Sequence, residues 1–503
     1  MQDKVIQERL KCEALKSKVM TAKEAAKFFE DGMLVGCSGF TPAGYPKAVP
    51  LEIAKRADNG EKIELSIITG ASVGDELDGA LSRAGVLKRR YPYQTNKDSR
   101  NGINNNEIQY ADMHLSHVPQ WVQYGYFGKM NIALVEAVAI TEDGGIIPST
   151  SIGNSDVFVE EADMVIVEIN TSQPLDLIGI HDIYTPKKPP YRKAIPIEKA
   201  TDKIGTTYIP CDINKIAGIV ITDIKDKTRA VAPIDETSSK MAKNLIGFLE
   251  NEVKEGRLGK NLLPLQSGVG SVANAVLGGL VDSDFEDLLV YSEVLQDSVL
   301  DLLDANKVKF ASATSLTISP ERLDDFYKNF SSYKDKLCLR PQGISNNPEV
   351  ARRLGVIAMN TAIEVDIFGN VNSTNIMGSR MMNGIGGSGD FARNAYLTIF
   401  TTESIAKNGD ISSIVPMVSH HDHTEHDVMV IVTEQGVADL RGKSPKERAK
   451  EIIENCAHPD YKDMLWDYFN KAMEGKYKHT PHVIGEALSW HDRFLKTGSM
   501  KLK

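Results

Sequence analysis

The sequence of 503 residues contains few cysteines and no long apolar run. Its five cysteines are scattered singly along the chain, without any Cys-x-x-Cys pair. This distribution argues against a disulfide framework and against a cysteine zinc site, and it predicts a protein of the reducing cytoplasm. No apolar stretch is long enough to cross a bilayer, so we expect no transmembrane helix and no membrane partner.

Positive charge is also in short supply. The formal net charge is −10, and so acidic a chain lacks the basic face that nucleic acid binding requires. An anionic ligand would have to be held by local lysines, arginines and backbone N–H groups. Residues 1–18 are predicted to form an amphipathic helix, and they have neither the apolar centre of a signal peptide nor the acid-poor composition of a transit peptide.

The remaining composition is that of a globular protein, and its length predicts two large domains or three small ones. Residues 132–153 align without gaps with residues 357–378, and three further pairs of segments match in the same order at nearly the same offset. We therefore predict two similar domains, residues 1–225 and residues 226–503, joined through the charged segment 223–237.

Short Val-, Ile- and Leu-rich runs alternate in both halves with stretches of helical period. The predicted strands are residues 65–69, 133–140, 164–169, 288–291, 398–401 and 428–433, and the predicted helices are residues 22–29, 239–255, 348–353 and 444–455. This alternation predicts open α/β sheets. In such sheets ligands bind beyond the carboxyl ends of the strands.

The two halves differ at one strand end. Where the first half reads Thr69-Gly70, the second reads Ser292-Glu293. We predict that Ser292 caps a helix opened by Glu293, so that the helix dipole would favour the ionised carboxylate that a carboxylate nucleophile requires. Acidic residues are also common in first helical turns for structural reasons. On the residues alone, Glu434 is an equal rival, because it ends another apolar run.

Two glycine-rich segments precede helical stretches. One reads Ser267-Gly268-Val269-Gly270-Ser271, and the other, NGIGGSGD, is residues 383–390. Both offer unhindered backbone N–H groups that could bind a phosphate or an oxyanion. The first lacks the third glycine of the dinucleotide fingerprint, and neither has the Gly-Lys-Ser/Thr of a P-loop. As isolated signals, such loops are usually tight turns.

A histidine tract, HHDHTEH, occupies residues 420–426 and has the composition of a metal site. It lacks the H-E-x-x-H spacing and precedes a strand, so we interpret it as a hydrogen-bonded polar loop. A metal-dependent enzyme or binding module built on His420 to His426 remains the alternative from a different class. Arg229 is interpreted as a surface charge, with a phosphate contact as the weaker alternative.

Four longer segments resemble the acetyl-CoA hydrolase/transferase branch of the class I CoA-transferases. They are GVGSVANAV (268–276), YSEVLQD (291–297) and the stretches 364–397 and 419–442, and the resemblance extends over nearly the whole chain. It implies two related open α/β domains of the NagB/RpiA-like type and a homodimer. It also implies a CoA-transferase that uses no metal and no permanently bound cofactor, because coenzyme A is its substrate and covalent intermediate.

The resemblance also implies roles for single residues. Glu293 would attack an acyl-CoA and then carry CoA as a thioester between small carboxylates, with succinyl-CoA and acetate as the expected pair. Gly387 would supply an oxyanion N–H, Glu434 would be a second active-site carboxylate, and Asn346 (or Asn347, in the alternative register) would bind the small carboxylate. The implied CoA site comprises Gly268, Val269, Gly270, Ser271, Val272, Asn383, Gly387 and Lys407. Hydrolysis of acetyl-CoA by the same glutamate is the alternative activity.

Overall fold

The computed structural model describes residues 2–228, 230 and 233–502, so Arg229 lies outside the described residues. The chain divides into two compact units. The first comprises Met1–Ala230, Val290–Leu303 and Lys309–Leu354, and the second comprises Val231–Leu289, Asp304–Val308 and Gly355–Lys503. The domain limits expected from the sequence, 1–225 and 226–503, stay a prediction.

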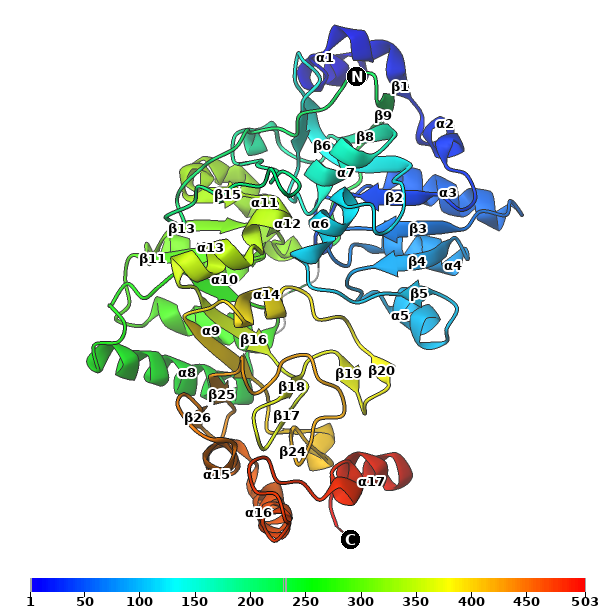
Figure 1. Cartoon of the computed structure of the whole chain (residues 1–503). Coiled ribbons are helices and arrows are strands. Elements are labelled where there is room, and N and C mark those ends of the chain that lie inside the picture. The colour runs from blue at the N-terminus through cyan, green and yellow to red at the C-terminus, as the bar shows by residue number, and fades with distance from the viewer. Residues whose placement is uncertain (1, 229, 231–232, 503) are drawn as a thin grey trace. The chain divides into compact units, whose positions relative to one another are not determined.

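The first unit contains an open sheet with the strand order β1-β9-β8-β6-β2-β3-β4-β5 (Figure 1). One further strand, β7, pairs with β6. The eight strands of this order are parallel, whereas β7 is antiparallel to β6. Every residue of β6 is buried, as expected of a central parallel strand. The strands are β1 Val19–Met20, β2 Leu34–Cys37, β3 Leu65–Ile68, β4 Leu87–Tyr91, β5 Gln109–Tyr110, β6 Ile132–Ile140, β7 Ile146–Pro148, β8 Met164–Asn170 and β9 Ile216–Thr222.

A second sheet has the strand order β15-β13-β11-β10-β16-β21-β25-β26. The pairs β10–β16, β16–β21 and β21–β25 are parallel, and β26 is antiparallel to β25. The strands are β10 Leu265–Ser267, β11 Leu288–Tyr291, β13 Val308–Ala313, β15 Leu337–Leu339, β16 Ile357–Thr361, β21 Leu397–Thr401, β25 Val430–Val432 and β26 Val437–Asp439.

The two sheets have the same topology. Read from β9, the first follows β9-β8-β6-β2-β3-β4-β5, and read from β25, the second follows β25-β21-β16-β10-β11-β13-β15. The aligned segments of the predicted repeat supply β6 and β16, which hold the same place in the two orders. The prediction of two related open α/β sheets is therefore confirmed.

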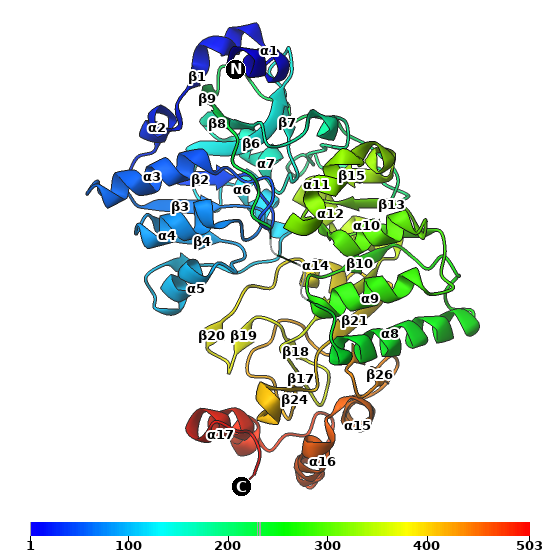
Figure 2. The same ribbon diagram turned by 180° about the vertical axis from the view of Figure 1, so that it is seen from behind.

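Short pairings and helices complete the chain. Small sheets are formed by β12 Val294–Leu295 with β14 Ser315–Leu316, by β18 Val371–Asn372, β17 Glu364–Asp366 and β24 Ile414–Val415, by β19 Asn375–Ile376 with β20 Arg380–Met381, and by β22 Ile405–Ala406 with β23 Ile411–Ser412. The helices are α1 Gln2–Arg9, α2 Ala22–Ala25, α3 Ala48–Asp58, α4 Ala80–Arg83, α5 Lys97–Asn104, α6 His117–Gln123, α7 Ser155–Glu161, α8 Glu236–Lys254, α9 Ser271–Val281, α10 Asp297–Asp304, α11 Pro320–Lys328, α12 Gln342–Ser345, α13 Pro348–Leu354, α14 Ser388–Ala392, α15 Pro445–Cys456, α16 Pro459–Met473 and α17 Ser489–Thr497. In the second unit α8 and α9 pack side by side (Figure 2).

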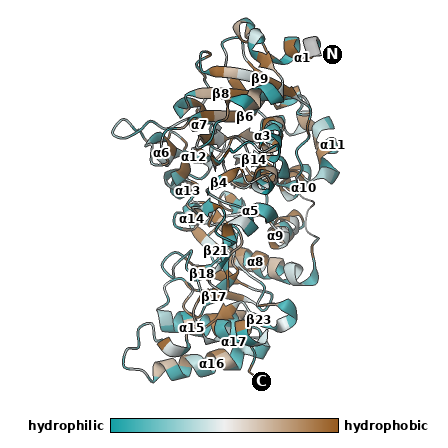
Figure 3. Cartoon of the chain, turned by 90° about the vertical axis from the view of Figure 1, so that its right-hand side faces the viewer, coloured by the Kyte–Doolittle hydropathy of each residue, from teal (hydrophilic) through white to brown (hydrophobic). Residues whose placement is uncertain are grey.

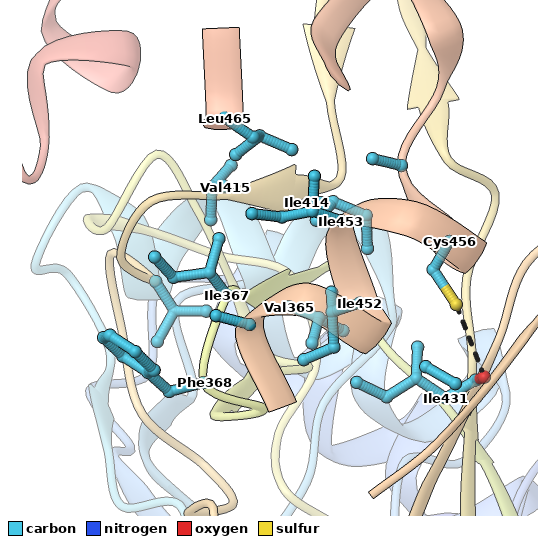
Figure 4. Packing of buried hydrophobic residues seen from close by; sticks show 14 of the residues in the cluster. Val365, Ile367, Phe368, Ile414, Val415, Ile431, Ile452, Ile453, Cys456 and Leu465 are labelled. Atoms are coloured by element: carbon cyan, nitrogen blue, oxygen red, sulfur yellow. Dashed lines mark hydrogen bonds between the residues drawn. The ribbon is translucent and has the colours of Figure 1, made fainter. Parts of the chain in front are cut away.

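Hydropathy follows the burial of these elements. Figure 3 shows the hydrophobic colour on β6, β8 and β9. In the second unit, β17, β24, β25 and α15 meet in one apolar core (Figure 4). This core also holds Val371, Phe400 and Val428, which lie next to the histidine tract in sequence or in space. Among the described residues, no helix is both long and apolar enough to span a bilayer.

Each predicted strand is present, although β25 is shorter than the predicted 428–433. The prediction of one helix over residues 1–18 is wrong, because α1 ends at Arg9. Leu10 instead forms a parallel bridge with Ile140, and Lys11 N donates to the Ile140 carbonyl at 3.0 Å. Burial of Leu10 against the end of β6 thus ends the helix earlier than its sequence period indicates.

Candidate active site

Glu293 lies just beyond the carboxyl end of β11, as predicted, but its local structure differs from the prediction. The two residues after it form β12, which pairs in parallel with β14, and α10 begins only at Asp297. The Glu293 carbonyl accepts hydrogen bonds from Thr314 N at 3.0 Å and Ser315 N at 3.2 Å. The expected helix with Ser292 as its cap is therefore wrong, because strand-type pairing takes up these backbone groups instead.

The side-chain amide of Asn346 contacts the Glu293 carboxyl. Asn346 Nδ2 donates to Glu293 Oε1 at 2.7 Å, and Asn346 Oδ1 accepts from Ser345 Oγ at 2.8 Å. These two bonds fix which way the amide faces. Asn346 is fully buried and follows α12, whose Ile344 carbonyl accepts a hydrogen bond from Tyr291 Oη at 2.6 Å. The strand before Glu293 and the helix before Asn346 are thus tied together.

The neighbouring Asn347 caps a helix instead. Its Oδ1 accepts from Glu349 N at 3.0 Å, in the first turn of α13, and its Nδ2 donates to the Gly343 carbonyl at 3.0 Å. Of the two adjacent asparagines that the sequence left open, Asn346 is therefore the one that contacts Glu293.

The electrostatic setting of Glu293 also differs from the prediction of an anion favoured by a helix dipole. Burial raises the pKa of the Glu293 carboxyl to about 7, and the hydrogen bond from Asn346 acts in the opposite direction. Burial disfavours the anion because protein replaces water around it, whereas the amide N–H stabilises the anion. Glu293 is consequently partly protonated at neutral pH and, when ionised, more basic than an ordinary carboxylate.

The first glycine loop lies at the switch point of the second sheet, where β10 has β11 on one side and β16 on the other. Residues 268–270 connect the carboxyl end of β10 with α9, and β10 pairs with β16. Gly268 N donates to the Met359 carbonyl of β16 at 3.0 Å, Val269 is 58% exposed, and Gly270 has a φ of 136°. Such a switch point is the usual ligand position in open α/β sheets. The loop and its exposed apolar side chain are therefore placed where a ligand of the second unit would bind.

Glu434 follows β25 and so lies, like the first glycine loop, beyond the carboxyl end of a strand of the second sheet. Its carboxylate accepts hydrogen bonds from Ser404 N at 2.9 Å, from Ser404 Oγ, and from Gln435 Nε2 at 2.9 Å. Burial alone would raise the pKa of Glu434, but the hydrogen bonds from Ser404 and Gln435 hold the pKa below its usual range. Ser404 follows β21, the neighbour of β25, and no sequence pattern had singled it out.

Gly387, the residue predicted to supply an oxyanion N–H, lies in the second unit. It is buried directly before α14, and its N–H donates to no group in the part of the chain that the structure describes. A buried N–H is normally paired, so this one is available to a ligand. Of the other predicted contacts, Asn383 is partly exposed and Lys407 is exposed, with its Nζ 4.9 Å from the centroid of the Phe494 ring.

The histidine tract is a polar, hydrogen-bonded segment. Asp422 accepts from Ser373 N at 2.6 Å and from Thr374 Oγ1 at 3.0 Å, and His423 is fully buried against Ser388 and Phe400. Across residues 2–228, 230 and 233–502, no group of three or more His, Cys, Asp or Glu side chains is arranged to hold a metal ion.

Comparison with known proteins identifies the chain as an enzyme of the CoA-transferase class. The N-terminal domain of acetyl-CoA hydrolase/transferase matches residues 4–221, and the C-terminal domain matches residues 323–469. The chain belongs to this acetyl-CoA hydrolase/transferase family. The family and the enzyme class predicted from the sequence are therefore confirmed.

Individual relatives cover nearly the whole chain. A succinyl-CoA:acetate CoA-transferase from Clostridium kluyveri is 60% identical over 498 residues, which is 99% of this chain and 93% of that protein. An acetyl-CoA hydrolase from Schizosaccharomyces pombe is 46% identical and covers 94% of each chain. Among solved structures, RipA from Yersinia pestis matches with a TM-score of 0.72 and 21% identity over 93% of this chain and 98% of that chain. A 4-hydroxybutyrate CoA-transferase from Porphyromonas gingivalis matches with a TM-score of 0.64 and 19% identity over 94% of this chain and 100% of that chain. These two structures support the fold alone.

Proposed function

We propose that this chain moves coenzyme A between small carboxylic acids through a thioester on Glu293. The observation that carries the proposal is the strand-end pair of Glu293 and Asn346, joined at 2.7 Å, in which burial raises the pKa of the carboxyl to about 7. Membership of the acetyl-CoA hydrolase/transferase family supplies the substrate class. The name of the Clostridium relative makes succinyl-CoA and acetate the donor and acceptor that we propose.

In the first half-reaction, ionised Glu293 attacks the thioester carbonyl of the acyl-CoA. The carbon–sulfur bond breaks, CoA leaves as a thiolate, and an acyl–glutamyl anhydride remains. The thiolate then attacks the Glu293 side-chain carbonyl, the carbon–oxygen bond breaks, and the donor acid leaves as a carboxylate. The products of this half-reaction are a free carboxylate and a glutamyl–CoA thioester.

In the second half-reaction, the acceptor carboxylate attacks the glutamyl carbonyl, and the same steps run in reverse to give the new acyl-CoA and ionised Glu293. One thioester is exchanged for another, so the balance requires no nucleotide, metal or redox partner. Every step passes through a tetrahedral oxyanion, for which preorganised N–H donors are the main source of rate. We assign this role to the N–H of Gly387.

The remaining groups bind and orient the substrates. Asn346 Nδ2 carries two hydrogens, of which one is donated to Glu293 and the other would hold the small carboxylate. Gly268, Val269, Gly270, Ser271 and Val272 would hold CoA together with Asn383 and Lys407. Glu434 would act as a second carboxylate that stays ionised, because its hydrogen bonds favour the anion.

Intact-mass spectrometry after brief exposure to succinyl-CoA, followed by peptide mapping, tests the nucleophile. We expect a CoA adduct on the peptide that contains Glu293, and we expect acetate to discharge it as acetyl-CoA. Glu293→Gln removes the nucleophilic oxygen and should form no adduct, although it keeps the side-chain volume. Folded wild-type protein that forms no adduct on Glu293 with succinyl-CoA or acetyl-CoA would overturn the covalent mechanism.

Hydrolysis is the second candidate activity, because the Schizosaccharomyces relative is named an acetyl-CoA hydrolase. Water would then take the place of the acceptor acid at the glutamyl thioester. The same adduct separates the two activities. Discharge that needs acetate and yields acetyl-CoA supports transfer, whereas discharge at the same rate in buffer alone supports hydrolysis.

We also propose a cytoplasmic homodimer. The five cysteines are all unpaired, which fits a reducing compartment. The dimer rests on the family resemblance, and light scattering coupled to size-exclusion chromatography measures it directly. A mass equal to that of one chain would exclude the homodimer.

A further inference from the structure

The segment that carries Gly387 is a tight turn whose central N–H donates to no group among residues 2–228, 230 and 233–502. Ser388 N donates to the Ile385 carbonyl at 3.3 Å, which closes a four-residue turn. Gly386 has a φ of 60°, and Gly387 has a φ of −91° and a ψ of 0°, which are the values of a type II′ turn. The N–H of Gly387 belongs to the central peptide of this turn and takes no part in the bond that closes it. A rotation of that peptide would therefore turn the Gly387 N–H away from a ligand without breaking the closing bond.

A second bond holds the same carbonyl. Ser388 Oγ donates to the Ile385 carbonyl at 2.7 Å, so the single hydrogen of this hydroxyl is already used. His423 Nε2 lies 3.0 Å from Ser388 Oγ. Because the hydroxyl has no second hydrogen to give, its oxygen must accept in this contact, and His423 must donate. The contact therefore requires a hydrogen on Nε2 of His423.

His423 itself is held by elements outside the turn. Its backbone forms a bridge with Val371, in which Val371 N donates to the His423 carbonyl at 2.8 Å and His423 N donates to the Val371 carbonyl at 3.1 Å. Its ring is fully buried and packs against the Phe400 ring of β21, with 4.6 Å between the ring centroids. The imidazole is thus fixed to the core of the second unit before it reaches Ser388.

We infer that His423 is a positioning residue for the reaction: it holds the turn at residues 385–388, through Ser388, so that the Gly387 N–H meets the tetrahedral oxyanion. This inference rests on the proposed function, because it assumes the oxyanion role of Gly387. It gives the histidine tract a catalytic purpose without a metal. A polar contact in a buried site also explains why a histidine occupies a position that an apolar residue would otherwise fill.

The test compares three substitutions at two positions. His423→Phe keeps a ring and removes the donor, whereas His423→Gln keeps an N–H donor at a similar distance from the backbone. Ser388→Ala removes the acceptor. We expect kcat to fall by roughly 10- to 100-fold in His423→Phe, with little change in KM. This loss in kcat does not exceed the loss that follows removal of an oxyanion donor itself. His423→Gln should recover most of the rate.

The expected signature is a loss that the two positions share. If Ser388 transmits the effect of His423, the double variant Ser388→Ala/His423→Phe should be no slower than the slower single variant. His421→Phe is the matched control, because His421 is an exposed histidine of the same tract. Near-ultraviolet circular dichroism checks that each variant is folded, and if His423→Phe does not fold, Ser388→Ala and His423→Gln still give the comparison.

Three outcomes would overturn the inference: a kcat of His423→Phe equal to that of His421→Phe, losses from the two positions that multiply, or a change in KM alone. The wild-type adduct on Glu293 separates this failure from failure of the proposed function. An adduct that forms at the wild-type rate in His423→Phe refutes the positioning role only, whereas absence of the adduct from wild-type protein refutes the covalent mechanism.

Discussion

Replacing Asn346 by alanine removes a hydrogen bond that stabilises the ionised form of Glu293. Burial raises the pKa of Glu293 to about 7 against this bond, so the variant should raise the pKa further. A hydrogen bond to a charged group contributes about 1.5–3 kcal/mol, and each pKa unit corresponds to about 1.36 kcal/mol. The expected shift is therefore roughly one to two units, which lowers the ionised fraction of Glu293 at neutral pH from about half to roughly 1–10%.

Only the ionised carboxylate attacks the thioester, so the rate of adduct formation rises with pH through the pKa of Glu293. In Asn346→Ala the rise should move to higher pH, and the variant should approach its own maximal rate only in alkaline buffer. Rapid-quench mass spectrometry of the glutamyl–CoA adduct, across the range in which Glu293 titrates, measures the midpoint in a single turnover.

Asn347→Ala is the matched control for this experiment. Asn347 caps α13 through Glu349 N, so its loss should lower the free energy of unfolding by about 1 kcal/mol and leave the midpoint unchanged. An Asn346→Ala midpoint equal to that of the wild type, or equal shifts in both variants, would refute the electrostatic role of the amide.

Three further predictions concern charged side chains. The Glu293 carboxyl has a pKa of about 7 in the folded chain against an ordinary 4.5, so the folded chain binds more protons and the fold becomes less stable as pH rises between these values. Glu293→Gln should therefore raise Tm above neutral pH and change Tm little in acid. A calorimetric rise in Tm in acid but not above neutral pH would contradict this. Burial favours the neutral form of Glu434, but its hydrogen bonds from Ser404 and Gln435 lower the pKa, so Glu434→Gln should slow transfer without moving the midpoint of the pH profile; a moved midpoint would make Glu434 the titrating group. The Nζ of Lys47 is fully buried, 2.5 Å from Glu136 and 2.7 Å from Asp226, so Lys47→Met should lower the free energy of unfolding by roughly 3–5 kcal/mol in urea titrations. Lys496→Met breaks an exposed ion pair and should change the free energy of unfolding little. Equal effects of the two substitutions would show that the buried ion pairs of Lys47 do not stabilise the fold.

The elements that sequence alone located are those whose signal is local. Apolar runs indicated β6, β8 and β11 because a strand buried on both faces is apolar along most of its length. The hairpin of β17 and β18 turns at Gly369-Asn370, a pair typical of such turns, and Gly369 has a φ of 94°. The repeated segments indicated two similar domains, and the two sheets share one topology.

The features that sequence did not locate depend on partners far along the chain. Glu293 was assigned to a helix because the pairing of β12 with β14 leaves no mark in the helical period that follows it. Ser404 binds a carboxylate 30 residues away, and His423 binds a hydroxyl 35 residues away. Nothing in the sequence around either residue indicates its partner, and two adjacent asparagines carry no pattern that says which one faces Glu293.

The difference between the expected and the observed setting of Glu293 has a chemical consequence. A helix dipole would have given a fully ionised, weakly basic carboxylate, no better a nucleophile than the acids that it exchanges. Burial instead raises the pKa of Glu293 to about 7, above the ordinary value of 4.5. The ionised fraction is then smaller, but each anion is more basic and therefore a stronger nucleophile than a substrate carboxylate. Asn346 limits the loss of ionised enzyme and leaves the carboxyl desolvated, so the two opposing effects together suit a residue that must both attack a thioester and leave as a carboxylate.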